Sequence, residues 1–214
     1  MDNHDAQTFV AAARIAADLA TSPQVAQRWT DESACAGMTV GGLAHHLFRQ
    51  ATVTVQLLAA PPVADAELVS LLGHYDRAAW VTAGPDAEVN VGVREGSNAD
   101  AAGGPEELRA LVEATLAELP AALAAPREPE TVHIPWQGWS LTTHDYVVTR
   151  LMEMVVHSDD LAASIGVPTP EFPEEVVAPV LGLLSGVAVR RHGQAAVVRA
   201  LSRPQRAPAS VSAF

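Results

Sequence analysis

The chain has 214 residues, 49% of them hydrophobic, and is therefore long and apolar enough to bury a substantial core, which excludes a disordered protein. Its formal net charge of −12 disfavours DNA, RNA and anionic lipid as partners, because binding a polyanion depends on clustered cations. All 13 basic residues are arginine. The absence of lysine excludes Schiff-base chemistry, a pyridoxal phosphate anchor and a phosphate-loop lysine.

The single cysteine, Cys35, excludes an internal disulfide, and the first residues, MDNHDAQTF, lack the charged and apolar regions of a signal peptide. These features predict a cytoplasmic protein. His, Arg, Asp or Pro interrupts each apolar run before it reaches the roughly 18 residues that span a bilayer, so we expect no membrane partner. For Cys35 itself, a small buried thiol is the favoured interpretation over a nucleophile.

Most of the first half of the chain is predicted to be helical, because apolar residues recur three and four positions apart. Thr39 is a suitable N-cap for the second helix, and Pro61 and Pro62 end it. In chain order, the expected elements are helices over 5–20, 40–60, 64–83 and 103–125, with a polar, glycine-rich connection over 92–104 that crosses a surface or covers a site.

The second half begins with a segment rich in Pro and Trp, 126–145, whose run TVHIPW is typical of a strand. A long helix follows, with Thr142 or Thr143 as its N-cap and Gly166 at its end. One or two further helices are expected after Gly166, and the last residues, 204–214, are predicted to form a tail.

The helix that ends at Gly166 carries a narrow polar stripe with Glu153 and His157 one turn apart, so their side chains point at one locus. Such a stripe is usually the solvated side of an amphipathic helix. Here apolar residues flank it closely, which favours an inward orientation. An inward Glu and His need a metal ion or a polar ligand, because an unpaired buried carboxylate costs several kcal/mol. The stripe comprises Tyr146, Arg150, Glu153, His157, Asp160 and Ser164.

A metal site would need a third ligand from another helix, and the segment LAHHLFRQ offers His45 and His46. These two residues lie about 100° apart around a helix, so at most one of them faces a given site. A histidine hydrogen-bonded to a carbonyl group is the alternative interpretation for either. Two imidazoles and one carboxylate with an open fourth position are typical of a catalytic metal site.

Two motifs carry a family resemblance. The segment TVGGLAHHLFRQ resembles the second-helix signature of the DinB-like proteins, in the branch related to mycothiol-dependent maleylpyruvate isomerase and the thiol S-transferases. The segment RLMEMVVHSDDLAASIG is similar to the second signature of that branch. The resemblance extends over about Val10 to Gly166 and implies that His46, together with Glu153 and His157, forms a metal triad.

The resemblance implies an all-α fold: a four-helix bundle with a long crossover connection over 1–167, followed by a C-terminal helical extension and tail over 168–214. It also implies a divalent metal, usually zinc and sometimes nickel, whose open position binds the sulfur of a low-molecular-weight thiol such as mycothiol. The isomerase has a separate C-terminal domain that supplies an active-site arginine. No residue of this chain matches that arginine, which argues against maleylpyruvate itself as the substrate.

Arg150 and Asp160 match polar positions of the family beside the ligands, where they are expected to orient Glu153 and to fix the tautomer of His157. Trp136 and Trp139 precede the ligand helix and are candidates for lining the thiol pocket, as are His133 and His144, although packing over the end of the bundle is the usual role of such tryptophans.

The leading hypothesis is a metal-dependent enzyme that generates a thiolate, which attacks a small electrophilic substrate. If the thiol later leaves, the result is isomerisation; if it stays, the result is S-transfer. Alternatives are a bundle that binds metal or a small ligand without turnover, a hydrolase or lyase that uses a metal-bound water with His144 or Asp160 as base, and a plain helical scaffold. The C-terminal helices are the candidate interface for a homodimer.

Overall fold

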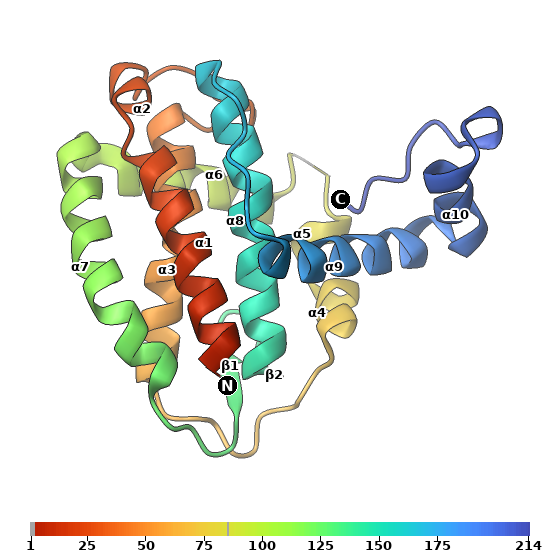
Figure 1. The fold of residues 1–214 in the computed structure, drawn as a ribbon, viewed down its shortest axis with the longest axis horizontal. Helices are drawn as coiled ribbons and strands as arrows, with labels where there is room; N and C mark the ends of the chain where they lie inside the picture. Colours follow the sequence, from red (N-terminus) through yellow and green to blue (C-terminus); the bar gives the residue numbers. More distant parts are fainter. Residues whose placement is uncertain (1–2, 85) are drawn as a thin grey trace.

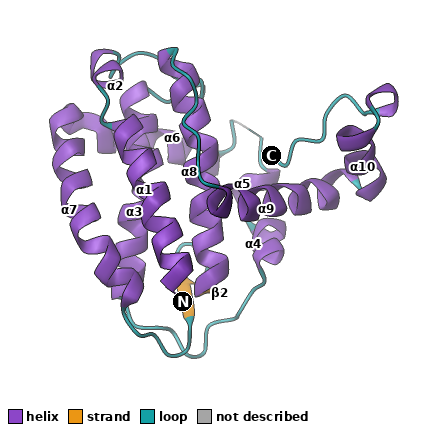
Figure 2. Ribbon diagram, in the orientation of Figure 1, coloured by secondary structure: helices purple, strands orange, loops and turns teal. Residues whose placement is uncertain are grey.

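The structure is a computed structural model that describes residues 3–84 and 86–214. Its core is a bundle of four long helices, which confirms the expected all-α fold (Figures 1 and 2). In Figure 1, the first and fourth of these helices run upwards, whereas the second and third run downwards. The bundle helices are α1 (Asn3–Ala20), α3 (Val40–Ala59), α7 (Gly104–Ala124) and α8 (Thr143–Ile165).

Because α3 and α7 run in the same direction, the chain between them must return along the whole bundle, and this segment is the crossover. It passes behind α8 in Figure 1 and supplies one side of the site described below. The crossover contains α4 (Leu71–Arg77), α5 (Ala79–Thr82), α6 (Glu88–Asp100) and the 3₁₀ turn η1 (Ala101–Gly103).

The prediction of one helix over 64–83 is wrong: residues 64–70 are not helical, and the rest forms two short helices, α4 and α5. Instead of winding into a helix, Glu67 and Val69 pair with the backbone of Ser140: the Ser140 N–H donates to Glu67 O at 2.8 Å, and the Val69 N–H donates to Ser140 O at 2.9 Å. Helix α4 begins only after Ser70, whose hydroxyl accepts a hydrogen bond from the Gly73 N–H. Pairing with a distant strand therefore overrides the local helical pattern.

The segment 92–104 lies over a site, as one form of the prediction has it, because five of its residues line the cavity described below. Its predicted irregular conformation is wrong, since most of it is helix α6. This helix packs across α3, and the side-chain oxygen of Asn98 accepts a hydrogen bond from the Thr39 N–H at 2.9 Å. The glycines in this segment disfavour an isolated helix by about 1 kcal/mol each. Packing of α6 against α3 outweighs that cost. Helix propensity is a property of the local sequence, so it does not include the contact between the two helices.

An antiparallel hairpin leads into α8. Its strands are β1 (Thr131–Ile134) and β2 (Trp139–Thr142), so the strand character of TVHIPW is confirmed. Thr142 caps α8 by accepting a hydrogen bond from the Asp145 N–H at 3.0 Å, and Gly166 ends the helix with φ 72°. Glycine adopts this left-handed conformation readily because it has no side chain, so the chain can leave the helix at this residue.

After α8 the chain forms α9 (Glu174–His192) and α10 (Gln194–Ser202), as the sequence predicts, and α10 projects away from the bundle in Figure 1. The predicted tail is partly ordered: after the 3₁₀ turn η2 (Pro204–Arg206), the chain folds back and Phe214 packs against Tyr75 and Trp80. The division of the chain after residue 167 stays a prediction.

One short helix, α2 (Pro23–Gln27), was not expected from the sequence.

The core lies between the four bundle helices and includes fully buried side chains such as Phe9, Leu43, Leu47 and Met154. Among the described residues, no helix combines the length and the apolarity that crossing a bilayer requires.

Candidate metal centre

Helices α3 and α8 bring the three predicted metal ligands together. His46 comes from α3, and Glu153 and His157 come from successive turns of α8. One candidate ligand atom from each residue lies within 4.8 Å of the other two. The His157 Nε2 lies 3.1 Å from Glu153 Oε2, and the imidazole rings of His46 and His157 meet edge to face with centroids 4.8 Å apart. With exposed side-chain fractions of 15% for Glu153 and 20% for His157, this pair lies away from the freely solvated surface.

A hydrogen-bond partner fixes the tautomer of His46. The hydroxyl of Ser97 on α6 donates its one proton to Val93 O at 2.8 Å, and it lies 3.2 Å from His46 Nδ1. Ser97 must therefore accept a proton from Nδ1. This leaves the Nε2 lone pair of His46 free to coordinate a cation.

His157 is held by a carboxylate in an equivalent way. Its Nδ1 lies 3.0 Å from Asp160 Oδ2, one turn further along α8, and its Nε2 faces Glu153. A carboxylate behind a histidine ligand orients the ring and raises its basicity. Asp160 therefore lies where its predicted orienting role requires.

The charge states of the triad follow from these contacts. Burial disfavours the charged form of Glu153, but the hydrogen bond and charge of His157 outweigh it and lower the pKa of Glu153 to about 2. Burial lowers the pKa of His46 to about 4. Burial also acts to lower the pKa of His157, but hydrogen bonds to Asp160, Cys35 and Glu153 outweigh it and raise that pKa well above its ordinary value. A carboxylate and a neutral imidazole, both in their metal-binding forms, thus face a protonated His157 whose proton a bound cation would displace.

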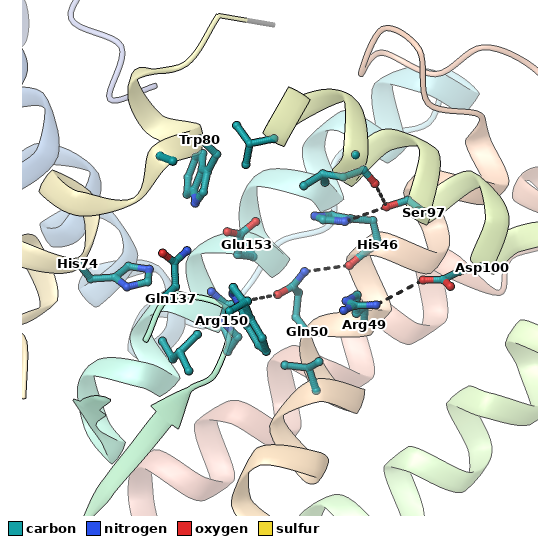
Figure 3. Close-up of a pocket in the computed structure, with 18 residues that line it drawn as sticks. His46, Arg49, Gln50, His74, Trp80, Ser97, Asp100, Gln137, Arg150 and Glu153 are labelled. Atoms are coloured by element: carbon teal, nitrogen blue, oxygen red, sulfur yellow. Dashed lines mark hydrogen bonds and ion pairs between the residues drawn. The ribbon is translucent and has the colours of Figure 1, made fainter. Parts of the chain in front are cut away.

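A cavity of about 590 Å³ opens beside His46 and Glu153 (Figure 3). Both ligand helices, the crossover and the hairpin contribute to its wall. Half of the 18 lining residues are apolar, aromatic or glycine, and the other half carry charged, amide, imidazole or hydroxyl groups. The lining residues from the ligand helices are His46, Arg49, Gln50, Val53, Arg150 and Glu153; those from the crossover and hairpin are His74, Ala79, Trp80, Val89, Gly92, Val93, Gly96, Ser97, Asp100, Ile134, Trp136 and Gln137.

The two predicted pocket tryptophans differ in position. Trp136, at the turn of the hairpin, lines the cavity and is 57% exposed. Trp139 does not line it; its indole Nε1–H donates to His74 Nδ1 at 3.1 Å. Because that bond occupies His74 Nδ1, and because burial lowers the pKa of His74 to about 4, His74 is a neutral part of the wall. Trp139 contributes indirectly, by holding His74.

Arg150 lies in the wall, but not against Glu153 as expected. Its Nη1 donates to Gln50 Oε1 at 2.7 Å and its Nε donates to Thr149 Oγ1 at 3.0 Å. Gln50 in turn donates to the carbonyl of His46 at 2.9 Å. Arg150 is therefore linked to the backbone of a ligand residue through a neutral amide, and it acts on Glu153 only through its charge.

His144 is not brought to the triad. It lies in the first turn of α8, is 62% exposed, and its Nδ1 lies 2.9 Å from Asp5 Oδ2 on α1. It does not line the cavity, so the structure offers no path by which it would act as a base there. His45 also stays outside the lining, whereas its neighbour His46 belongs to it.

Cys35 lies beside the triad without lining the cavity. Its sulfur and ligand atoms of His157 and Asp160 lie within 4.8 Å of one another. The turn that carries Cys35 is attached to α8, because the Ala34 N–H donates to Ser164 Oγ at 2.8 Å. This half-buried thiol is closer to the site than the sequence indicates.

Four further residues of the site escaped sequence reasoning: Gln50, His74, Trp80 and Ser97. The sequence held a signal for Gln50, because it is a polar residue one turn after His46 on the same face of the helix. The other three lie on the crossover, whose path over α3 and α8 is not encoded in any local pattern.

Comparison with known families gives one match. The family described as mycothiol maleylpyruvate isomerase N-terminal domain matches residues 9–162, a range that runs from α1 into α8 and contains the whole triad. No curated protein matches the chain, and no solved structure matches it.

Proposed function

The chain belongs to the mycothiol maleylpyruvate isomerase N-terminal domain family, and we propose from this premise that it is a metal-dependent enzyme using a low-molecular-weight thiol, with mycothiol the first candidate. The thiol is transferred to a small electrophilic substrate or assists its isomerisation. One observation supports this proposal most: His46, Glu153 and His157 converge beside a cavity of small-molecule size, and each histidine has a partner at Nδ1.

The donor set fits a divalent cation. Two imidazole nitrogens and one carboxylate oxygen suit zinc, and nickel is the alternative. His46, Glu153 and His157 would hold the ion, and three protein donors leave a position for a ligand from the cavity. A bound cation of this kind lowers the pKa of a coordinated thiol, so that the thiolate is present at neutral pH.

The residues of the chain have distinct tasks around such a thiolate. Ser97 and Asp160 keep protons on the Nδ1 atoms of the two histidines, which presents each Nε2 to the ion. Trp80 and Trp136 provide apolar walls that limit water around the sulfur.

In the reaction, a lone pair of the sulfur forms a bond to one carbon of an activated double bond, the π bond breaks, and its electron pair moves into the activating carbonyl group as an enolate. Isomerisation requires rotation about the resulting single bond, after which the π bond forms again and the carbon–sulfur bond breaks to release the thiolate. S-transfer by addition requires that the enolate carbon takes up a proton from solvent, so that the carbon–sulfur bond persists.

No observation favours the hydrolase alternative. His144 is bound to Asp5 outside the cavity, and Asp160 Oδ2 is engaged by His157. A bundle that binds metal without turnover stays an outcome of the experiment below.

The first experiment measures metal content by mass spectrometry on tag-free protein, for wild type, His46→Ala, Glu153→Ala and the matched control His45→Ala. We expect near-stoichiometric zinc or nickel in wild type and His45→Ala, and loss in the other two variants. Wild-type protein that stays free of metal after reconstitution would refute the proposal.

The second experiment incubates the metal-loaded protein with a thiol and an electrophilic acceptor and follows loss of free thiol. Acceleration over the metal-free protein supports catalysis. Stoichiometric metal without acceleration by any thiol tested would leave a binding protein in place of an enzyme.

A further inference from the structure

The guanidinium of Arg150 is a cation with neutral partners only. It donates to an amide oxygen of Gln50 and a hydroxyl of Thr149, and these two contacts use only part of its donor set. Its third neighbour is the ring of Tyr146, whose centroid lies 5.7 Å from the guanidinium carbon. Among the described residues, none of the ion pairs includes Arg150. Arg150 also lines the cavity, where Figure 3 shows it next to Gln50.

The other charges of the cavity are compensated. Arg49 forms an ion pair with Asp100 at 3.4 Å, at the side of the cavity remote from Trp80 (Figure 3). Glu153 is engaged by His157. His74 accepts the indole N–H of Trp139 at its Nδ1, so that nitrogen carries no proton and the ring is neutral. His46 is paired with the hydroxyl of Ser97. One positive charge, that of Arg150, therefore faces the cavity without an anionic partner.

The rest of the wall is uncharged and comes mostly from the crossover and hairpin. Trp80 and Trp136 present aromatic surface, aliphatic side chains line the cavity beside them, and Gln50, Ser97 and Gln137 are its neutral polar members. The aromatic and aliphatic part favours an apolar body on the ligand, because burying apolar surface is favourable. The aliphatic lining residues are Val53, Ala79, Val89, Val93 and Ile134.

We infer that the cavity selects substrates with a single carboxylate, seated on Arg150, and an apolar or aromatic body against Trp80 and Trp136. This inference rests on the proposed function for its charge balance. Among the groups that line the cavity, a divalent ion with Glu153 leaves one positive charge, which the thiolate neutralises, and Arg150 supplies one more, which one carboxylate neutralises. The carboxylate of Asp160 lies behind His157, outside this lining. A second carboxylate on the substrate would be desolvated without a partner, which disfavours small dicarboxylates.

The test compares three probes by isothermal titration calorimetry: 3-phenylpropanoate, its neutral analogue 3-phenylpropanamide, and maleate, a dianion without an apolar body. Each is titrated into metal-loaded protein containing 2-mercaptoethanol, and into metal-free protein, in which no ion competes for the carboxylate. In the loaded protein we expect the acid to bind at least about tenfold more tightly than both the amide and maleate, since a hydrogen bond between two charged groups is stronger than one between a charged and a neutral group.

Three variants test whether Arg150 causes the preference for the acid over the amide. Arg150→Gln should abolish the preference for acid over amide in both metal states, and Arg150→Lys should restore part of it because it keeps the charge. Arg109→Gln on α7, outside the cavity, should leave the preference intact. Circular dichroism and thermal unfolding establish that each variant is folded. A merely structural role of Arg150 would reduce acid and amide binding together, and Arg150→Lys would not restore the difference.

Equal binding of acid and amide to wild type, a preference that survives in Arg150→Gln, or no measurable binding of the acid at millimolar concentration would each overturn the inference. If the proposed metal centre is wrong, the measurement of metal content shows it independently of these titrations. The titrations into metal-free protein then still test whether Arg150 binds the carboxylate.

Discussion

The two walls of the cavity are built in different ways. The wall formed by α3 and α8 is part of the bundle core: Leu47 and Met154, next to two of the metal ligands, are fully buried. The opposite wall comes from the crossover and the hairpin. Ile134 is buried there, but other apolar side chains are substantially exposed, at 43% for Val93 and 57% for Trp136. Rigid packing positions the proposed metal ligands, whereas a more exposed wall can change its side chains without disturbing the fold.

The largest expected effect compares one apolar residue from each wall, buried Leu47 and half-exposed Val93. Leu47→Ala should lower the free energy of unfolding by about 3 kcal/mol, because it leaves a cavity in the core. Val93→Ala on the crossover should change it by less than about 1 kcal/mol, since that side chain is half exposed. Urea denaturation of both variants measures the difference, and similar losses would show that the two walls are equally tightly packed.

Within the crossover, His74 should make stability depend on pH. Burial lowers its folded-state pKa to about 4, so as pH falls from about 7 to 4 the unfolded chain gains a proton that the folded chain does not. Stability is then complete above about pH 6.5 and falls towards pH 4, by at most about 3 kcal/mol from this residue.

The measurement is the free energy of unfolding of metal-free protein at several pH values, for wild type and His74→Gln. Glutamine keeps an acceptor for the Trp139 N–H but does not titrate. The variant should lose less stability than wild type between pH 7 and pH 4. Parallel pH profiles would contradict a neutral, buried His74.

On the ligand wall, Asp160→Asn should weaken metal binding by about 10- to 100-fold, because the ring of His157 loses its carboxylate partner. The neighbouring Asp159→Asn is the matched control: its carboxylate accepts a hydrogen bond from the Thr169 hydroxyl, and we expect no change. Competition with a chromogenic chelator measures both affinities. Equal affinities for the two variants would assign Asp160 no role at the site.

The smallest effect concerns the contact between Phe214 and the more exposed wall. The Phe214 ring lies 5.1 Å from that of Trp80 and 5.6 Å from that of Tyr75, measured between centroids. Phe214→Ala should cost about 1 kcal/mol of stability, the usual contribution of aromatic pairs. It should also alter the intrinsic tryptophan fluorescence and weaken binding of 3-phenylpropanoate, since Trp80 lines the cavity.

For Phe214 the control is Leu201→Ala, which removes a 76% exposed side chain on α10 and should leave both the fluorescence and the binding of 3-phenylpropanoate unchanged. If Phe214→Ala also leaves the fluorescence and the binding unchanged, the contact between Phe214 and Trp80 does not stabilise the crossover side of the cavity.

The long helices were predictable because their signals are local. Thr39 and Thr142 cap α3 and α8 as expected, and Gly166 ends α8. The crossover was not predictable: a pairing of Val69 with Ser140 replaces part of a helix there, and packing over α3 forms α6 in a glycine-containing segment. In both places, contacts between segments far apart in the chain decide the structure. A local stretch of sequence contains no information about such contacts.

The sequence by itself determined the all-α class, the spacing that aligns Glu153 with His157, and, through the family motifs, His46 as their expected partner. Helical periodicity is a property of neighbouring residues, so it can be read without a structure. Only the tertiary structure decided that Ser97, 51 positions away, sets the tautomer of His46, and that Arg150 pairs with Gln50, 100 positions away, instead of with a carboxylate. These contacts join helices far apart in the chain, and bundle packing alone brings them within hydrogen-bonding distance.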